Sequence, residues 1–63
     1  MATKERIKNC LNMACDEGYI SKENSFDELN DLSYEILSFD FSDSEIDELD
    51  ENEIEKVFND WRV

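Results

Sequence analysis

The chain has 63 residues, of which 18 are Asp or Glu and six are Lys or Arg, and its net charge at neutral pH is -12. A chain of this length has room for one domain with a small core, so we expect residues 1–63 to form a single acidic domain, stabilised by a partner or as a homodimer. Two cysteines are too few for a disulfide-stabilised secreted scaffold, and no apolar run has the length of a membrane span or signal-peptide core. The sequence therefore predicts a cytoplasmic protein with no membrane partner.

Apolar residues recur at helical spacing along the chain. There is no proline and only one glycine, and strand patterns are missing, so the sequence predicts an all-α fold, a small three- to four-helix bundle. The first helix is predicted at about residues 4–17, with Thr3 as the N-cap and Gly18 in the left-handed position that ends it. Its apolar stripe contains Ile7, Cys10, Leu11, Ala14 and Cys15.

The second helix is predicted at about residues 26–38. Ser25 and Glu28 have the spacing of a capping box, in which each side chain accepts a hydrogen bond from the backbone N–H of the other residue. The apolar stripe of this helix contains Phe26, Leu29, Leu32, Ile36 and Leu37.

The C-terminal part is predicted to form two helices, at about residues 44–49 and 51–61, the former starting at Ser42 or Ser44. On one continuous helix, Asp50 and Glu53 would lie inside the apolar arc, where unpaired carboxylates are costly. We therefore expect a break near Asp50, which would act as an N-cap with Glu53 as its capping-box partner. The apolar residues of the last helix are Ile54, Val57, Phe58 and Trp61.

The acidic residues are segregated. Fourteen of them lie between Glu23 and Glu55, where there is no Lys or Arg. Asp27, Asp31 and Glu35 are four residues apart on the predicted second helix, and like charges at that spacing destabilise a helix by a few tenths of a kcal/mol (~0.2–0.5). A small domain needs a net charge of only about 2 to 8 in magnitude to stay in solution. A surface that only faces solvent usually carries charges of both signs, so this pattern favours a surface that binds a basic partner.

The charge pattern of residues 23–55 is similar to that of nucleic acid. On helices lying side by side, the carboxylates fall at about one per 2 to 3.5 Å, between the phosphate spacings of duplex and single strand. In this respect the chain resembles the small acidic inhibitors with which phages and mobile elements block restriction, CRISPR or other DNA-handling proteins. The resemblance implies a non-enzymatic inhibitor or modulator that binds the basic surface of a nucleic-acid-binding protein. The predicted contact residues are Asp27, Glu28, Asp31, Glu35, Asp43, Asp47, Glu48 and Glu51. The candidate apolar anchors are Tyr34, Phe41 and Trp61, although aromatic residues at helical spacing more often belong to the core.

Two other hypotheses stay open. The first is a small interaction module or regulatory subunit that binds through apolar residues such as Tyr34 or Trp61, its acid serving to keep it in solution. The second comes from residues 24–27, Asn-Ser-Phe-Asp, which resemble the acyl carrier proteins around the serine that starts their second helix. That resemblance implies a phosphopantetheine arm on Ser25, although Asn24 stands where the family has aspartate.

Catalysis and metal binding have little support in the sequence. The chain has no histidine, and no serine or cysteine has a recognisable nucleophile setting, so we expect no enzyme and no cofactor. From Asp40 onward no register supplies the glycine of an EF-hand calcium loop, and Cys10 and Cys15 are two zinc ligands at best. Both cysteines suit a core. We expect no direct binding of nucleic acid, because a net charge of -12 repels phosphate.

Overall fold

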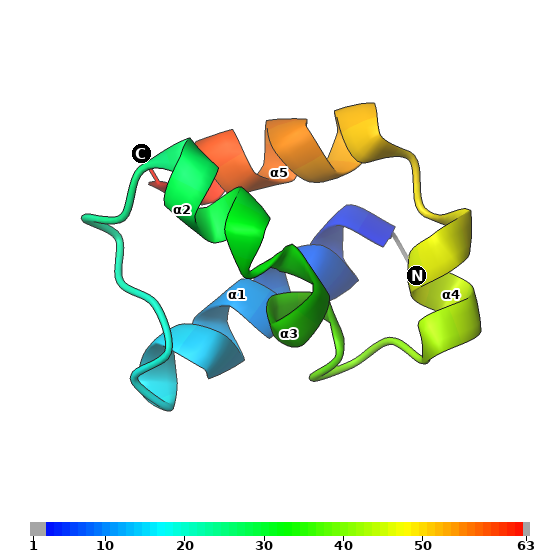
Figure 1. Cartoon of the computed structure of the whole chain (residues 1–63), viewed down its shortest axis with the longest axis horizontal. Coiled ribbons are helices and arrows are strands. Elements are labelled where there is room, and N and C mark those ends of the chain that lie inside the picture. The colour runs from blue at the N-terminus through cyan, green and yellow to red at the C-terminus, as the bar shows by residue number, and fades with distance from the viewer. Residues whose placement is uncertain (1–2, 63) are drawn as a thin grey trace.

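Five helices make up the regular structure of residues 3–62, which the computed structural model describes (Figure 1). They are α1 (Thr3–Asp16), α2 (Phe26–Asp31), α3 (Ser33–Leu37), α4 (Asp43–Glu48) and α5 (Glu51–Arg62). The predicted all-α fold is confirmed for these residues, but only α1, with 14 residues, and α5, with 12, are longer than six residues. None of the described helices is both long and apolar enough to cross a membrane.

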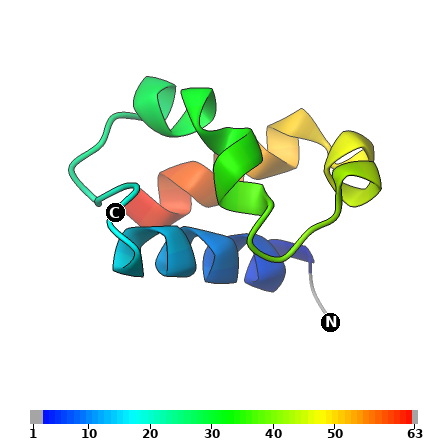
Figure 2. The ribbon, with the colours of Figure 1, turned by 60° about the horizontal axis from the view of Figure 1, so that its bottom comes forward.

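The two long helices pack against each other, and the short helices are added around them. α3 packs against α1, and α2 packs against α5. Figure 2 shows α1 along one edge of the molecule and α2 at the opposite edge, with α3 reaching from the side of α2 toward α1. Within residues 3–62 every buried side chain is apolar. These core residues are Ile7, Cys10, Leu11, Ala14, Ile20, Leu29, Ile36, Leu37, Phe41, Val57, Phe58 and Trp61.

The first helix agrees with the prediction to within one residue at each end. Thr3, predicted as the N-cap, is instead the first residue of α1. The C-terminal end is confirmed, because Gly18 has a φ of 87°, a left-handed conformation that residues with a Cβ rarely adopt. Its N–H bonds to the carbonyl of Cys15, and the N–H of Tyr19 bonds to that of Ala14, both at 3.0 Å.

The single helix predicted over residues 26–38 is wrong, because the chain breaks at Leu32. Leu32 has φ -102° and ψ 10°, and its N–H bonds to the carbonyl of Leu29, three residues before it, at 3.1 Å, in a tight turn of the 3₁₀ type. The turn lets α2 and α3 pack against different partners. In α2 the ring of Phe26 lies edge-on to that of Phe58 in α5, with ring centres 6.4 Å apart, whereas the Leu37 carbonyl of α3 accepts a weak bond from the Cys10 thiol of α1 at 3.6 Å. Leu32, predicted in the apolar stripe, is therefore left 38% exposed.

Capping boxes start both α2 and α4. At α2, the Ser25 hydroxyl accepts from the N–H of Glu28 at 3.2 Å, and the Glu28 carboxylate accepts from the N–H of Ser25 at 2.8 Å, as predicted. At α4 the cap is Ser42 rather than Ser44, and its partner is Glu45, with hydrogen bonds of 3.3 and 3.0 Å. The N–H of Ser25 lowers the pKa of Glu28, with smaller effects from the side chains of Asn24 and Ser25. The pKa of Glu45 is lowered first by the N–H of Ser42 and then by Arg6.

The predicted break near Asp50 is confirmed, so residues 44–61 form two helices. Leu49 leaves the helical conformation with a ψ of 143°, and the Asp50 carboxylate accepts from the N–H of Asn52 at 2.9 Å, as an N-cap does. The predicted capping-box partner is wrong, because no hydrogen bond joins Glu53 to Asp50 within residues 3–62. Glu53 is half-buried on the first turn of α5.

Arg6 ties the basic helix to the acidic part of the chain. Its guanidinium contacts the carboxylates of Asp40 and Glu45, each at 3.2 Å, and donates to the Asp40 carbonyl at 2.7 Å. It also lies 4.2 Å from the centre of the Phe41 ring, within the range of a cation–π contact. These are the ion pairs of residues 3–62, and they fix the connection between α3 and α4 on α1.

We predict that Ser42→Ala destabilises the fold by about 1 kcal/mol, the usual effect of losing a serine N-cap. Ser44 provides the matched control, since it is exposed inside α4 and is not the cap. Ser44→Ala should leave the stability unchanged or raise it slightly, because alanine is the better helix former. Urea unfolding followed by circular dichroism measures both, and an equal loss in the two variants would contradict the assignment of Ser42 as the cap.

The capping box of α2 also makes stability depend on pH. Because folding lowers the pKa of Glu28, its contribution is complete above the ordinary carboxyl pKa of about 4.3 and is lost as the pH falls through the lowered value. Glu28→Gln keeps a side chain that can accept from Ser25 but cannot titrate, so we expect it to remove this part of the acid destabilisation. Urea midpoints at a series of pH values measure the effect.

Glu23→Gln is the control for the pH experiment, because it removes one charge near the same helix start without removing a capping bond. The difference in midpoint between wild type and Glu28→Gln should shrink as the pH falls below about 4.3, relative to the same difference for Glu23→Gln. A difference that stays constant over the whole range would show that Glu28 contributes nothing through its ionised form.

Candidate functional site

The charges of the molecule are divided between its two sides. α1 carries Lys4, Arg6 and Lys8, whereas the acidic segment, defined here as residues Glu23–Glu55, contains α2, α3, α4 and the first turn of α5 and has 14 carboxylates. In Figure 2, α1 lies along one edge and α2 at the opposite edge, with α3 between them. All of these carboxylates are exposed except that of Glu53, which is half-buried. The acidic segment therefore forms a surface that a partner can reach.

Four carboxylates of the acidic segment form a cap or an ion pair within residues 3–62. Glu28 and Glu45 complete capping boxes, Asp50 caps α5, and Asp40 pairs with Arg6. Glu28 was among the predicted contact residues, and its capping role gives it a reason to be present that does not involve a partner. The other ten carboxylates form neither an ion pair nor a cap among the described residues.

Several of these ten lie where acid destabilises a helix. The C-terminal end of a helix carries a partial negative charge, which disfavours carboxylates in its last turn. Asp31 lies in the last turn of α2, and Asp47 and Glu48 lie in that of α4, and neither helix has a basic residue there to offset them. Glu51 and Glu55 are four residues apart on α5, where like charges repel, although Glu51 lies in the first turn, where the helix dipole favours acid. Asp31, Asp47 and Glu48 therefore lower the stability of the helices that carry them.

The predicted row of Asp27, Asp31 and Glu35 is not one row. Asp27 and Asp31 are four residues apart on α2, but Glu35 lies on α3, beyond the turn at Leu32. The three carboxylates therefore do not share a continuous helix face. Glu35 lines a different hollow of the surface, described below.

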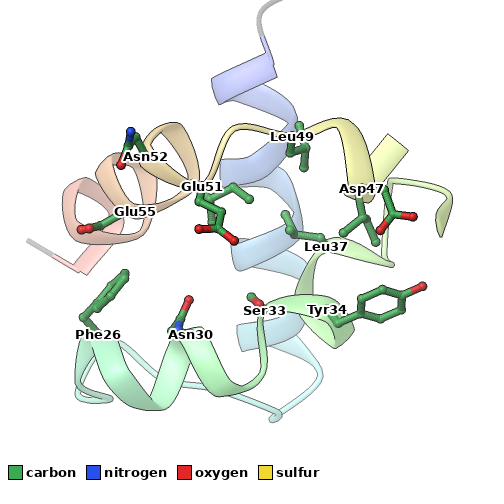
Figure 3. Close-up of a pocket in the computed structure, with 12 residues that line it drawn as sticks. Phe26, Asn30, Ser33, Tyr34, Leu37, Asp47, Leu49, Glu51, Asn52 and Glu55 are labelled. Atoms are coloured by element: carbon green, nitrogen blue, oxygen red, sulfur yellow. The ribbon is translucent and has the colours of Figure 1, made fainter. Parts of the chain in front are cut away.

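A groove of about 460 Å³ is lined by residues of α2 and α3 on one wall and of α4 and α5 on the other, and we call it the acidic groove (Figure 3). Its carboxylates are Asp47, Glu51 and Glu55, and no Lys or Arg lines it. Asn30, Ser33, Tyr34 and Asn52 provide neutral polar groups. The apolar lining consists of side chains that are buried or half-buried, namely Phe26, Leu37, Ile46, Leu49 and Ile54.

Figure 3 shows how the groove is arranged. Asp47 and Tyr34 lie beside each other at one end, Phe26 and Glu55 lie across from each other at the other end, and the Glu51 carboxylate points into the middle. Of the predicted contact residues, the groove therefore brings together Tyr34, Asp47 and Glu51. Glu55 was not predicted as a contact residue, although it is acidic and one turn from Glu51.

Tyr34 is the predicted apolar anchor that remains accessible, with 48% of its surface exposed. Its interaction with the Asp43 carboxylate is the largest cause of the raised pKa of its hydroxyl, and burial, Asp43 and Asp47 add to this. Glu48 is exposed on α4 but does not line the acidic groove.

The prediction of Trp61 and Phe41 as surface anchors is wrong, because each is only 6% exposed. Trp61 packs in the core, and its indole N–H donates to the Asn12 side chain at 2.8 Å. The amino group of Lys22 lies 5.0 Å from its ring centre. Phe41 is covered by Arg6. Both aromatic side chains thus pack within the chain and expose little surface to a partner.

A second surface feature was missed in the sequence. Tyr19, Leu32 and Phe39 are 65%, 38% and 36% exposed and line a hollow of about 280 Å³, which we call the apolar hollow. The rings of Tyr19 and Phe39 pack with their centres 5.8 Å apart. Its one carboxylate is that of Glu35. Tyr19 and Phe39 each follow the end of a predicted helix, which was the available indication that they do not belong to a helical core stripe.

The described residues offer little reactive chemistry. Cys10 is a free thiol in the core, and burial is the main cause that raises its pKa to about 11. Cys15 is half-buried against the core, as predicted, and Ser25 serves as the cap of α2. Within residues 3–62 no three Cys, Asp or Glu side chains converge closely enough to hold a metal ion.

Comparison with protein-family models, with curated proteins and with solved structures finds no match to this chain. The acidic segment, the acidic groove and the apolar hollow are therefore the features from which a function can be argued.

Proposed function

We propose that this protein is a non-enzymatic binding protein that uses its acidic segment to occupy the basic, phosphate-binding surface of a DNA- or RNA-handling protein. It would thereby inhibit or modulate that protein, in the manner of anti-restriction or anti-CRISPR inhibitors. The proposal includes a cytoplasmic location and a fold that acts as one small helical bundle. It rests mainly on one observation, the ten carboxylates that have neither an ion pair nor a capping role among the described residues.

Placement of the acid supports this proposal. The acid in the last turns of α2 and α4 lowers stability, so a benefit outside the fold is its best explanation. The molecule is 28 Å long, and 14 carboxylates over that length correspond to about one per 2 Å. Duplex DNA carries about one phosphate charge per 1.7 Å and each strand one per 3.4 Å. A phosphate-binding surface would therefore meet a similar charge density, and long-range attraction would speed the association.

A second candidate function is an interaction module that binds through apolar residues. The apolar hollow favours it, because Tyr19, Leu32 and Phe39 expose large apolar side chains next to one another. Exposed apolar patches of this kind commonly mark protein–protein contacts. The two candidates predict different responses to salt, because ionic contacts are screened and apolar contacts are not.

An affinity capture separates the two candidates. The bait is the tagged full chain, incubated with lysate of the cell that expresses it and washed at about 50 mM and about 200 mM salt, a range over which phosphate-type contacts weaken by orders of magnitude. We expect nucleic-acid-handling proteins to be retained at low salt, lost at high salt and displaced by added DNA. The quadruple variant Asp31→Asn, Asp47→Asn, Glu48→Gln, Glu55→Gln should lose them.

The double variant Leu32→Ser, Phe39→Ser is the matched bait for the second candidate, and it should retain the partner if the acidic segment carries the function. A partner without a nucleic-acid-binding surface, held at both salt concentrations and lost only from the double variant, would refute the proposal and establish the interaction module.

A further inference from the structure

We infer that the acidic groove is the docking site for a basic amphipathic segment of the partner, with one apolar side chain entering the groove and Lys or Arg residues pairing with its carboxylates. This inference rests on the proposed function and deepens it, because it names the part of the partner surface that the protein contacts. It concerns the groove alone, so it can fail while the proposed function stands.

The apolar lining provides the first argument. The volume of about 460 Å³ lies within the range of about 300 to 1,000 Å³ that is usual for ligand pockets in proteins. Phe26, Ile46, Leu49 and Ile54 pack against the core but are only half-buried by their own chain. An apolar side chain placed between α3 and α5 would remove this remaining surface from water, which is favourable. A purely polar cation would leave it exposed.

The charge of the groove provides the second argument. Its lining has three carboxylates and no cation, and all three come from α4 and α5. Glu51 and Glu55 are separated by about 6 Å along α5, the rise of four helical residues. Basic residues four apart on a docked helix would have the same spacing. They would pair with Glu51 and Glu55 and relieve the repulsion between these two carboxylates.

The opposite wall of the groove is neutral. Asn30, Ser33 and Tyr34 come from α2 and α3 and offer amide and hydroxyl groups (Figure 3). The groove is thus acidic on one wall, neutral on the other and apolar between them. A segment with basic residues along one edge of an apolar stripe matches this arrangement, whereas an acidic or phosphorylated segment would be repelled.

A designed peptide tests the groove without knowledge of the natural partner. The probe is a peptide of Leu and Lys, about 18 residues or five helical turns long, with its leucines on one helical stripe. A scrambled peptide of the same composition has the same charge but no stripe. Titration into the isotope-labelled full chain, followed by two-dimensional NMR, gives both the affinity and the location of binding. We expect shifts at groove residues, among them Asn30, Ser33 and Asn52, and an affinity at least tenfold above that of the scrambled peptide.

Matched variants separate the groove from the rest of the acidic segment. Glu51→Gln with Glu55→Gln and Asp27→Asn with Asp31→Asn each remove two exposed carboxylates spaced four residues apart, but only the first pair lines the groove. The first pair should weaken binding at least tenfold and the second less than about threefold. The variant Asn30→Trp is designed to fill the groove, and it should also weaken binding at least tenfold. Asn9→Trp, on α1, is its control and should leave the affinity unchanged. Both asparagines are exposed, so folding is not at risk, and circular dichroism checks it.

Three results would overturn the groove as the docking site. The first is equal weakening by the two carboxylate pairs, and the second is equal affinity for the striped and scrambled peptides, since either would mean general charge attraction. The third is a set of NMR shifts centred on the apolar hollow. In each case the affinity capture above still decides the proposed function, because it depends on the whole acidic segment and not on the groove.

Discussion

The structure depends on one constraint: the acidic segment must bury apolar residues while almost every carboxylate in it stays in water. Leu29, Ile36 and Leu37 are buried, and no charged side chain within residues 3–62 is. Short helices satisfy both demands, because the turn at Leu32 lets α2 pack against α5 and α3 against α1, while α4 has no fully buried residue. Short helices have many ends, however, and these are stabilised locally by the capping boxes of α2 and α4 and by Asp50 at α5. Arg6 then fastens the connection between α3 and α4 to the basic helix.

The same constraint produces the acidic groove. Residues of α2 and α3 form one wall of this groove and residues of α4 and α5 form the other, and their own side chains leave it unfilled. Asp47 and Glu51 come from neighbouring helices, and the break at Asp50 brings both to this groove. Three of the carboxylates that form neither a cap nor an ion pair among the described residues therefore lie beside incompletely covered apolar side chains.

Features set by a few neighbouring residues could be predicted from the sequence. The left-handed Gly18, the capping box at Ser25 and the break at Asp50 belong to this group. The break at Leu32 could not be predicted, because no glycine or proline marks it and its cause is the packing of α2 and α3 on different helices. The hydrogen bond from the Trp61 indole to Asn12, 49 residues away in sequence, could not be predicted either. The groove and the hollow likewise join residues of separate helices, so the sequence could suggest single members but not the site.

Unfolding free energies measured in urea at low ionic strength test most directly whether the excess acid serves a partner and not the fold. The quadruple variant Asp31→Asn, Asp47→Asn, Glu48→Gln, Glu55→Gln removes carboxylates that form no cap and no ion pair among the described residues. If they are present at the expense of stability, the variant unfolds at a higher urea concentration than the wild type, and added salt reduces the difference by screening the repulsion. A variant less stable than the wild type would show that these carboxylates support the fold, and would contradict the account.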